Sequence, residues 1–482
     1  MPIHIARELH DKERVFSPYF AHTVCFHSST SSYRKAETVI NADYHRCGTP
    51  STISADTIRR CTLAEGKEII RYKHQEATNI LVAHGFPKTG IWPKDQELPE
   101  NLKNSPLNGF TIDPVSIMVP ELAAQWPPPL PNDISADGSK IYSQPDNSTH
   151  PPNPGRRGSR CLIHENQRET ELIHYAQWIN MNQDRDPFNS FLHPCSFESN
   201  VESVLYITID AIMLDSQSSI HVKGGKHGSR DSNERVKHWN IVIQRGESDE
   251  RYRITSVSID EAFRQLIAFL LVNDLHRRYM IFFTDGETTI FTAIDTYFSQ
   301  WHHKCYLDPY HIEEKIYTLL SLALLSTRVD DPWHSKEIIS GPGKSEKTSI
   351  SRLYGRRLMN ILWWGNVDEA KYYIEHIDPS LVKNKTALNN LLTYISADEK
   401  KGKGKYITCY AMRKKAGLLN SSNSAEGENE VIVGERQKVD ERMFWTVQGS
   451  GPLASLTCIF ANGEDMDWFV KGCFSFKKNW AA

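Results

Sequence analysis

The sequence predicts an α/β fold in which a mixed sheet carries helices on its faces, with a smaller helical region before it. Two observations predict the sheet: short β-rich runs stop at acidic residues, and the later runs alternate with amphipathic helices. A proline-rich stretch at 126–160, which cannot build a core, divides the chain into an earlier and a later part. At 482 residues, the chain is long enough for two or three domains.

Composition argues against a membrane protein. Hydrophobic residues make up 39% of the chain and charged residues 24%, which is typical of globular proteins in water. The longest apolar run, 267–272, is far shorter than the roughly 20 residues that a membrane span needs. The first residues also lack the apolar segment of a secretion signal. We therefore expect a cytoplasmic protein with no membrane partner.

Neither the charge nor the cysteine content identifies a ligand. The net charge of −3 does not by itself indicate nucleic-acid binding, which depends on local basic patches. Nine cysteines without a CxxC pair argue against a zinc ribbon and against a disulfide framework.

Residues 31–70 are predicted to form two helices on either side of a Gly-Pro break at 48–50. Apolar residues recur at helical spacing in the first helix, and Ser54 is a suitable N-cap for the second. Two helices joined in this way can form a helix-turn-helix, whose second helix enters the major groove of DNA. An ordinary helical hairpin fits the same pattern. The basic residues of this region that would contact DNA are Arg34, Lys35, Arg59 and Arg60.

The block after residue 200 carries the clearest strand pattern. β-rich runs at 204–209, 219–224 and 239–243 predict three successive strands. A helix follows at 258–274, because Ser258 with Glu261 three positions later forms a capping box.

Helix and strand then alternate. The apolar run 280–283 predicts a fourth strand, followed by a helix at 288–301, a fifth strand at 304–307 and a helix from 311. Three strands followed by this alternation give the element order of the RNase H-like fold. The region 312–415 is predicted to be mostly helical.

Two aspartates occupy strand ends in this scheme. Asp210 ends the first predicted strand and Asp285 ends the fourth, and catalytic groups of α/β sheets gather at such carboxyl ends. Adjacent carboxylates repel each other unless a cation intervenes, and their hard oxygens suit Mg²⁺ or Mn²⁺. Each aspartate alone could instead serve as a turn former or helix cap. Asp215 and Glu287 are competing carboxylates that end no predicted strand.

A third acidic group lies in the stretch 423–433, which has the pattern of a helix start. Ser424 is the candidate cap and Glu426 lies in the first turn, but Glu428 and Glu430 fit equally well. A glutamate in the first turn often only complements the helix dipole. The pattern does not choose among the three.

Two further groups are candidates for accessory roles. Asp308 and His311 form a D-x-x-H pair after the fifth strand, which could hold a metal ion or position DNA, although a single histidine is often structural. A basic segment would track DNA phosphates if it is more than a solvated surface; its cations are Lys403, Lys405, Arg413, Lys414 and Lys415.

The strand order, the Thr-Asp-Gly turn at 284–286, the segment 306–311 and the Ser-Ala-Glu-Gly stretch at 424–427 together resemble bacterial insertion-sequence transposases of the Lre type. These lie near the Mutator-like group of DDE transposases. The resemblance covers about residues 31–70 and 200–470.

This resemblance implies that Asp210, Asp285 and Glu426 are catalytic and hold two Mg²⁺ (or Mn²⁺) ions, with Asp308 and His311 as possible accessory residues. It implies cutting at the ends of an insertion sequence and joining of 3′-hydroxyls to target DNA by direct transesterification. The partners would be terminal inverted repeats, target DNA and further copies of the chain. The alternatives are another RNase H-fold metal nuclease, or a transposase-derived DNA-binding regulator with an inactive core.

The expected organisation follows from the linker and the resemblance. It comprises an N-terminal DNA-binding region at 1–125, a proline-rich linker at 126–165, the first part of an RNase H-like core at 166–311, a helical insertion at 312–415 and the last part of the core at 416–482.

Overall fold

The chain divides into two compact units, each assembled from separate segments. Unit 1 combines Met1–Asn108, Asn200–Cys305 and Ser422–Ala482, and unit 2 combines Gly109–Ser199 and Tyr306–Ser421. The computed structural model describes residues 7–8, 15–48, 52–106, 109–112, 195–198, 201–215, 235–330, 347–397, 401–415, 418–421, 427–438, 445–478 and 480.

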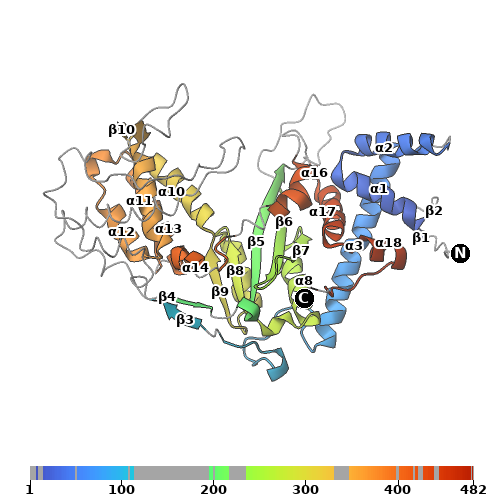
Figure 1. Ribbon diagram of the computed structural model, residues 1–482, viewed down its shortest axis with the longest axis horizontal. Coiled ribbons are helices and arrows are strands. Elements are labelled where there is room, and N and C mark those ends of the chain that lie inside the picture. Colours follow the sequence, from blue (N-terminus) through green and yellow to red (C-terminus); the bar gives the residue numbers. More distant parts are fainter. Residues whose placement is uncertain are drawn as a thin grey trace. The chain divides into compact units, whose positions relative to one another are not determined.

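A five-stranded mixed sheet, which lies mainly in unit 1, confirms the predicted α/β class (Figure 1). Its strands lie in the order β7-β6-β5-β8-β9. β5 pairs antiparallel with β6 and parallel with β8, and β6 pairs antiparallel with β7. The strands are β5 (Val204–Asp215), β6 (Arg235–Arg245), β7 (Arg251–Ser256), β8 (Tyr279–Thr284) and β9 (His303–Leu307).

β5, β6 and β7 differ from the predicted strands. β5 does not end before Asp210 but continues to Asp215, because its second half still pairs with β6. The predicted second strand, 219–224, lies outside the described residues, and the predicted third strand, 239–243, is part of β6. β7 was not predicted, although its arginines alternate with Tyr252 and Ile254 at the period of two that is typical of a half-buried strand. Those arginines bind an acidic side chain from another segment, which strand periodicity cannot reveal.

One face of the sheet packs against α8 (Ile259–Val272) and α9 (Thr288–Tyr297). Alternate residues of β5, such as Ile207, are fully buried there with residues of α8 such as Phe263. The predicted N-cap of α8 is confirmed, since the Ser258 hydroxyl accepts a hydrogen bond from the Glu261 backbone N–H.

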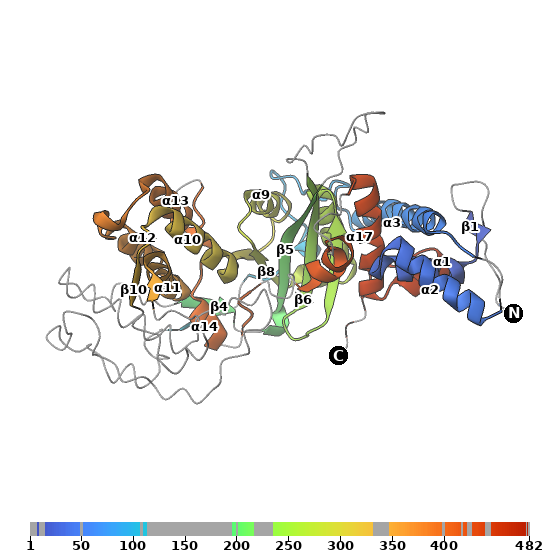
Figure 2. The ribbon, with the colours of Figure 1, turned by 90° about the horizontal axis from the view of Figure 1, so that it is seen from above.

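The other face carries the C-terminal helices. α17 (Val447–Asn462) lies beside β6 and β7 (Figure 2), and the helical segment 427–437 covers the second half of β5. Ile212 of β5 packs there with Ile432 and Val433. The segment contains one π-helical stretch, Glu430–Gly434, before α16 (Glu435–Gln437); α18 (Asp465–Lys471) follows α17.

The N-terminal helices belong to unit 1 rather than to a region of their own. α1 (Pro18–Thr30) and α2 (Tyr33–Arg46) precede α3 (Ala55–Ala83), which is 29 residues long and opens at the predicted N-cap Ser54. α3 packs on α17 and on α8. This arrangement differs from the predicted separate region 1–125, because the apolar side chains of α3 are buried against the sheet unit. The predicted linker, 126–165, lies outside the described residues.

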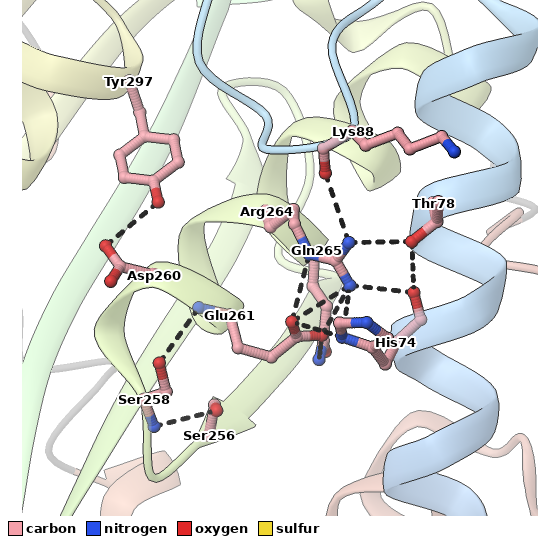
Figure 3. Close-up of polar contacts among 10 residues, drawn as sticks. All are labelled: His74, Thr78, Lys88, Ser256, Ser258, Asp260, Glu261, Arg264, Gln265 and Tyr297. Carbon is pink, nitrogen blue, oxygen red and sulfur yellow. Dashed lines mark hydrogen bonds and ion pairs between the residues drawn. The ribbon is translucent and has the colours of Figure 1, made fainter.

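A buried arginine joins α3 to α8 (Figure 3). Arg264 of α8 donates hydrogen bonds to the Thr78 hydroxyl at 2.8 Å, to the His74 carbonyl at 2.8 Å and to the Lys88 carbonyl at 3.2 Å. Its charge is balanced by Glu261, one turn earlier on the same helix. Polar bonds therefore supplement the apolar contact between the two helices.

Unit 2 is mostly helical where the sequence predicts helices between 312 and 415. Its helices are α10 (Pro309–Ala323), α11 (Ile350–Trp363), α12 (Val367–Glu375), α13 (Lys385–Ile395) and α14 (Tyr410–Lys415). It also contains two strand pairs, β3 (Gly109–Ile112) with β4 (Cys195–Glu198) and β10 (Arg328–Asp330) with β11 (Lys347–Ser349). A further pair, β1 (Arg7–Glu8) with β2 (Val15–Phe16), belongs to unit 1. Among the described helices, none is long and apolar enough to cross a membrane.

Candidate functional site

Asp210 and Asp285 lie next to each other on two neighbouring parallel strands. Ile209 of β5 is paired with Thr284, the last residue of β8; Asp210 is the next residue of β5, and Asp285 is the first residue after β8. Successive residues of a strand point to opposite faces and Ile209 is buried on the α8 side, so Asp210 faces away from that side. Neighbouring strands lie about 4.8 Å apart, so the backbones of the two aspartates are close to each other. Both residues are half-buried.

The turn after β8 fixes the position of Asp285. Its carboxylate accepts a hydrogen bond of 2.8 Å from the backbone N–H of Glu287, and the Thr284 hydroxyl accepts one from Gly286. Gly286 has a φ of 92°, a conformation that glycine adopts without steric cost. The Asp-Gly pair thus forms the turn that its composition predicts. The same turn holds the carboxylate of Asp285 in place.

Two hydrogen bonds orient the carboxylate of Asp210. Oδ1 accepts from the backbone N–H of Ala211 at 2.7 Å, and Oδ2 accepts from the side-chain amide of Asn429 at 2.5 Å. Asn429 belongs to the helical segment 427–437 and is 6% exposed. The segment therefore meets the sheet at the candidate acid itself.

Asn429 is held in turn by a chain of buried polar groups that crosses the sheet. Its carbonyl oxygen accepts from Asn240 Nδ2 of β6 at 2.6 Å, and the carbonyl oxygen of Asn240 accepts from the Thr255 hydroxyl of β7 at 2.6 Å. Both Asn240 and Thr255 are almost completely buried. These bonds determine which way each amide points, and so they present the Asn429 N–H₂ group to Asp210.

Glu428 is occupied by a structural ion pair. Its carboxylate accepts from Arg253 Nη2 at 2.7 Å and from Arg251 Nη1 at 3.3 Å, and also from Arg253 Nε. Burial acts to raise the pKa of Glu428, but the hydrogen bonds and charges of Arg253 and then Arg251 hold this pKa below its ordinary value. Glu428 therefore fastens the segment 427–437 to β7 as a carboxylate.

The other candidates for the third acid have different positions. Glu430 is exposed, and Glu426 lies outside the described residues. Among the residues that the structure describes, no group of three or more His, Cys, Asp or Glu side chains is arranged to hold a metal ion. The described part of the site therefore consists of two carboxylates and their amide support.

The two competing carboxylates of the sequence have other surroundings. Glu287 accepts hydrogen bonds of 2.5 Å from Lys237 Nζ, and this ammonium lies 4.0 Å from the centre of the Trp239 ring. Asp215 is the residue that ends β5, contrary to the prediction that Asp210 does, and its exposed side chain lies 4.0 Å from Arg235. Lys237 thus balances the charge of Glu287 beside the site. Asp215 lies five positions after Asp210 along β5.

Asp308 and His311 belong to unit 2, where Asp308 caps α10. Its carboxylate accepts a hydrogen bond of 2.7 Å from the Tyr310 backbone N–H, and the side chain is 1% exposed. His311 is half-buried in the first turn of the same helix, with its ring edge-on to that of Tyr310. Asp308 is therefore the N-cap of α10.

The predicted DNA-contacting cations fall into two groups. Arg34 and Lys35 of α2 are exposed, and so are Arg59 and Arg60 of α3, which both pair with Asp56. In unit 2, Lys405 and Lys414 are exposed, whereas Lys403 is 9% exposed; the side chain of Lys415 lies outside the described residues.

Arg413 is not a surface cation. Its side chain is fully buried, it donates a hydrogen bond to the Leu419 carbonyl at 2.8 Å, and it lies 4.6 Å from the centre of the Tyr306 ring. A guanidinium buried in this way supports the packing of unit 2 and cannot reach a phosphate without unfolding its surroundings.

Sequence reasoning missed the amides that support Asp210. Asn240 interrupts the apolar run 239–243 of β6, which is a signal that a buried polar group has a partner. Asn429 carries no such signal, since it stands in a polar stretch beside three glutamates.

Comparisons with models of known protein families, with curated proteins and with solved structures give no match to this chain.

Proposed function

We propose that the chain is a DNA transposase with an RNase H-like core, in which Asp210, Asp285 and Glu426 hold two divalent metal ions. The observation that carries the proposal is the adjacency of Asp210 and Asp285 on paired parallel strands, with Asp210 oriented by Asn429. A structural turn or cap would not need a second aspartate and a buried amide chain at the same place.

The architecture of unit 1 supports the RNase H-like assignment. An antiparallel run of three strands is followed by two strands that alternate with helices, and the first strand lies at the centre of the order β7-β6-β5-β8-β9. In this order the central strand carries Asp210 and its parallel neighbour carries Asp285. A fold of this kind hosts several chemistries, so the function depends on the residues of the site.

The donor set fits divalent metal ions. Carboxylate oxygens are hard ligands that suit Mg²⁺ or Mn²⁺, and two half-buried aspartates side by side repel each other without a cation. When bound, the metal ions would supply Lewis-acid activation of water and of the 3′-hydroxyl and would stabilise the leaving oxygen at phosphorus.

The residues of the chain would hold and orient this site. Asn429 orients the Asp210 carboxylate through a hydrogen bond to one of its oxygens. The Asp-Gly turn orients the carboxylate of Asp285. Glu426 precedes Asn429 by three positions in the sequence. Glu428 is paired with two arginines, so Glu426 is the better candidate for the third metal ligand.

DNA would be bound through surface cations. The exposed Arg34, Lys35, Arg59 and Arg60 would contact phosphates of the terminal inverted repeats, and Lys405 and Lys414 would contribute from unit 2. Synapsis of two ends would require more than one copy of the chain, which is an argument by analogy with transposases.

Metal binding gives the first test. We expect Mn²⁺ titration, followed by electron paramagnetic resonance, to show binding to the full-length protein and its loss in Asp210→Asn and Asp285→Asn. Asp215→Asn is the matched control, because it removes a carboxylate from the same strand and should bind as the wild type does. Equal binding by all four proteins would overturn the assignment.

DNA chemistry gives the second test. With Mg²⁺, the protein should nick DNA carrying the inverted repeats that flank its gene, and should join pre-cleaved 3′ ends to a target plasmid. The two aspartate variants should do neither while still binding DNA. Nicking without joining would indicate another metal nuclease, and metal-independent DNA binding alone would indicate a regulator with an inactive core.

A further inference from the structure

A pocket of about 540 Å³ lies in unit 1 between the first turns of α2 and α3 and two residues of the C-terminal part of the chain. The residues that define it are Tyr33, Arg34, Asp56, Arg59, Arg436 and Trp445. Its composition combines aromatic rings with guanidinium groups, which is the combination that binds nucleic-acid bases and phosphates.

Arg436 is a buried cation at this pocket. It is 4% exposed, and its Nε donates to the Ser28 carbonyl at 3.0 Å. Its guanidinium lies 5.0 Å from the centre of the Tyr33 ring and 5.5 Å from that of Trp445. Among the described residues it makes no ion pair, although a charge buried in this way is costly without an anion.

Tyr33 supplies a second unsatisfied group. Its hydroxyl is buried and has no hydrogen-bond partner among the described residues. Buried hydroxyl groups are nearly always hydrogen-bonded, so this one marks a place where a ligand group completes the site. It can donate to an oxygen or accept from an amino group of a base.

The charge at the pocket is positive. Arg34, Arg59 and Arg436 contribute three cations, and Asp56 contributes one carboxylate, which is already paired with Arg59 at 2.9 Å. Helix α2 also begins at the pocket, and the start of a helix carries partial positive charge. An anion is therefore favoured over a neutral or cationic ligand.

The pocket is connected to the candidate acidic site by two short stretches of chain. Arg436 follows Asn429 by seven residues along a helical segment, or about 10 Å. The Trp445 backbone N–H bonds to the Asp215 carbonyl at 2.9 Å, and Asp215 lies five residues along β5 from Asp210, or about 17 Å. The two stretches are therefore about 10 Å and about 17 Å long. At about 3.4 Å per nucleotide of duplex, these lengths correspond to roughly three to five nucleotides.

We propose that this pocket binds a nucleotide, with its phosphate on Arg34, Arg59 and Arg436 and its base against Trp445 and Tyr33. The ligand chemistry is a nucleoside phosphate, and a DNA strand that also reaches Asp210 is its source. This last statement rests on the proposed function, whereas binding of a nucleoside phosphate does not.

The test measures binding without divalent metal, so that cleavage plays no part. A fluorescently labelled single-stranded oligonucleotide is titrated with the full-length protein in EDTA and followed by anisotropy. Thymidine monophosphate and inorganic phosphate are then added as competitors. We expect Trp445→Ala to weaken oligonucleotide binding by about tenfold or more, and Trp445→Phe to restore most of it.

Charge-matched variants separate the pocket from general attraction. Arg34→Ala with Arg59→Ala should weaken binding several-fold more than Arg46→Ala with Lys67→Ala, which removes two exposed cations from the same two helices. Tyr33→Phe, which keeps the ring and hence the packing, should weaken binding through the hydroxyl alone. Equal losses in the two double variants, together with full binding by Trp445→Ala, would overturn the proposal.

The competitors identify the source of the nucleotide. Tighter binding of the oligonucleotide than of thymidine monophosphate supports a DNA strand, and equal binding assigns the pocket to a free nucleotide. Competition by inorganic phosphate as strong as that by the nucleotide would overturn the role of the aromatic rings. The oligonucleotide titration is done in EDTA and needs no metal ion, and the Mn²⁺ titration proposed for the acidic site needs no DNA, so failure of the acidic site and failure of the pocket are distinguishable.

Discussion

The side-chain amide of Asn429 donates a hydrogen bond of 2.5 Å to the carboxylate of Asp210, across 219 residues of sequence. This bond joins the helical segment 427–437 to the central strand of the sheet. It makes Asn429 the residue through which the C-terminal part of the chain controls the orientation of the candidate acid.

Replacing Asn429 tests this control. Asn429→Ala leaves Asn240 without its acceptor and Asp210 without one donor, so we expect the free energy of unfolding to fall by about 1–3 kcal/mol. Mn²⁺ affinity should fall as well, because the Asp210 carboxylate is no longer held in one orientation. Chemical denaturation and metal titration measure the two effects. Asn79→Ala, on the exposed side of α3, is the control; identical behaviour of the two variants would contradict the assigned role.

Three glutamates of one stretch should give three different results. Glu426→Gln should abolish DNA cleavage with little change in stability, and Glu430→Gln should change neither, because its side chain is exposed. Glu428→Gln should lower the free energy of unfolding by about 3 kcal/mol, since it leaves Arg253 without its buried partner. Cleavage and thermal denaturation assays of the three variants measure this. Full cleavage by Glu426→Gln would remove it from the site.

The Glu428 ion pairs should also depend on pH. Arg253 and Arg251 hold the pKa of this carboxyl below its ordinary value despite burial, which acts in the opposite direction. Because the folded pKa lies below the unfolded one, the stabilisation is present at neutral pH and is lost as the pH falls through the carboxyl range. The acid transition of Glu428→Gln should therefore be shallower than that of the wild type.

His238 should make the fold sensitive to mild acid. Burial lowers its pKa to about 4, its Nε2 donates to the Ser450 hydroxyl at 2.6 Å, and its Nδ1 has no partner among the described residues. The unfolded chain binds a proton near pH 6.5 and the folded chain does so only near pH 4. Stability is therefore lost as the pH falls between these values, by about 3 kcal/mol in total.

Unfolding at pH 7 and pH 5 measures this contribution. His238→Gln keeps a donor for Ser450 but has no titrating group, so its unfolding free energy should change less between the two pH values than that of the wild type. An equal pH dependence of the two proteins would exclude His238 as the cause.

Arg264 should be essential for docking α3 on α8. Arg264→Ala removes the hydrogen bonds to His74, Thr78 and Lys88 and leaves Glu261 without its nearest cation (Figure 3), so we expect a loss of about 3–5 kcal/mol. Arg71→Ala, which breaks an exposed pair on α3, should cost about 0–1 kcal/mol. Denaturant unfolding compares them, and equal costs would show that apolar packing alone joins the helices.

Local pattern was sufficient for several parts of the molecule. The continuous apolar run 280–283 predicted β8, and the Ser258 hydroxyl caps α8 as its position indicates. The Asp-Gly pair at 285–286 forms the expected turn. These features depend on residues a few positions apart, whose interactions a sequence displays directly.

Tertiary structure decided what the local pattern left open. The arginines of β7, Arg251 and Arg253, are paired with Glu428, about 175 residues later in the chain, and no local pattern shows this pairing. The same pairing distinguishes Glu428 from its neighbours, which the helix-start pattern could not do.

The sequence by itself determined the sheet class, most of its strands and the two aspartates that stand at the junction of β5 and β8. Only the tertiary structure brought Asn429 onto Asp210 and placed Arg436 near the rings of Tyr33 and Trp445. The physical reason is that backbone periodicity is written in neighbouring residues, whereas a buried hydrogen bond or cation depends on which distant segment the packing brings against it.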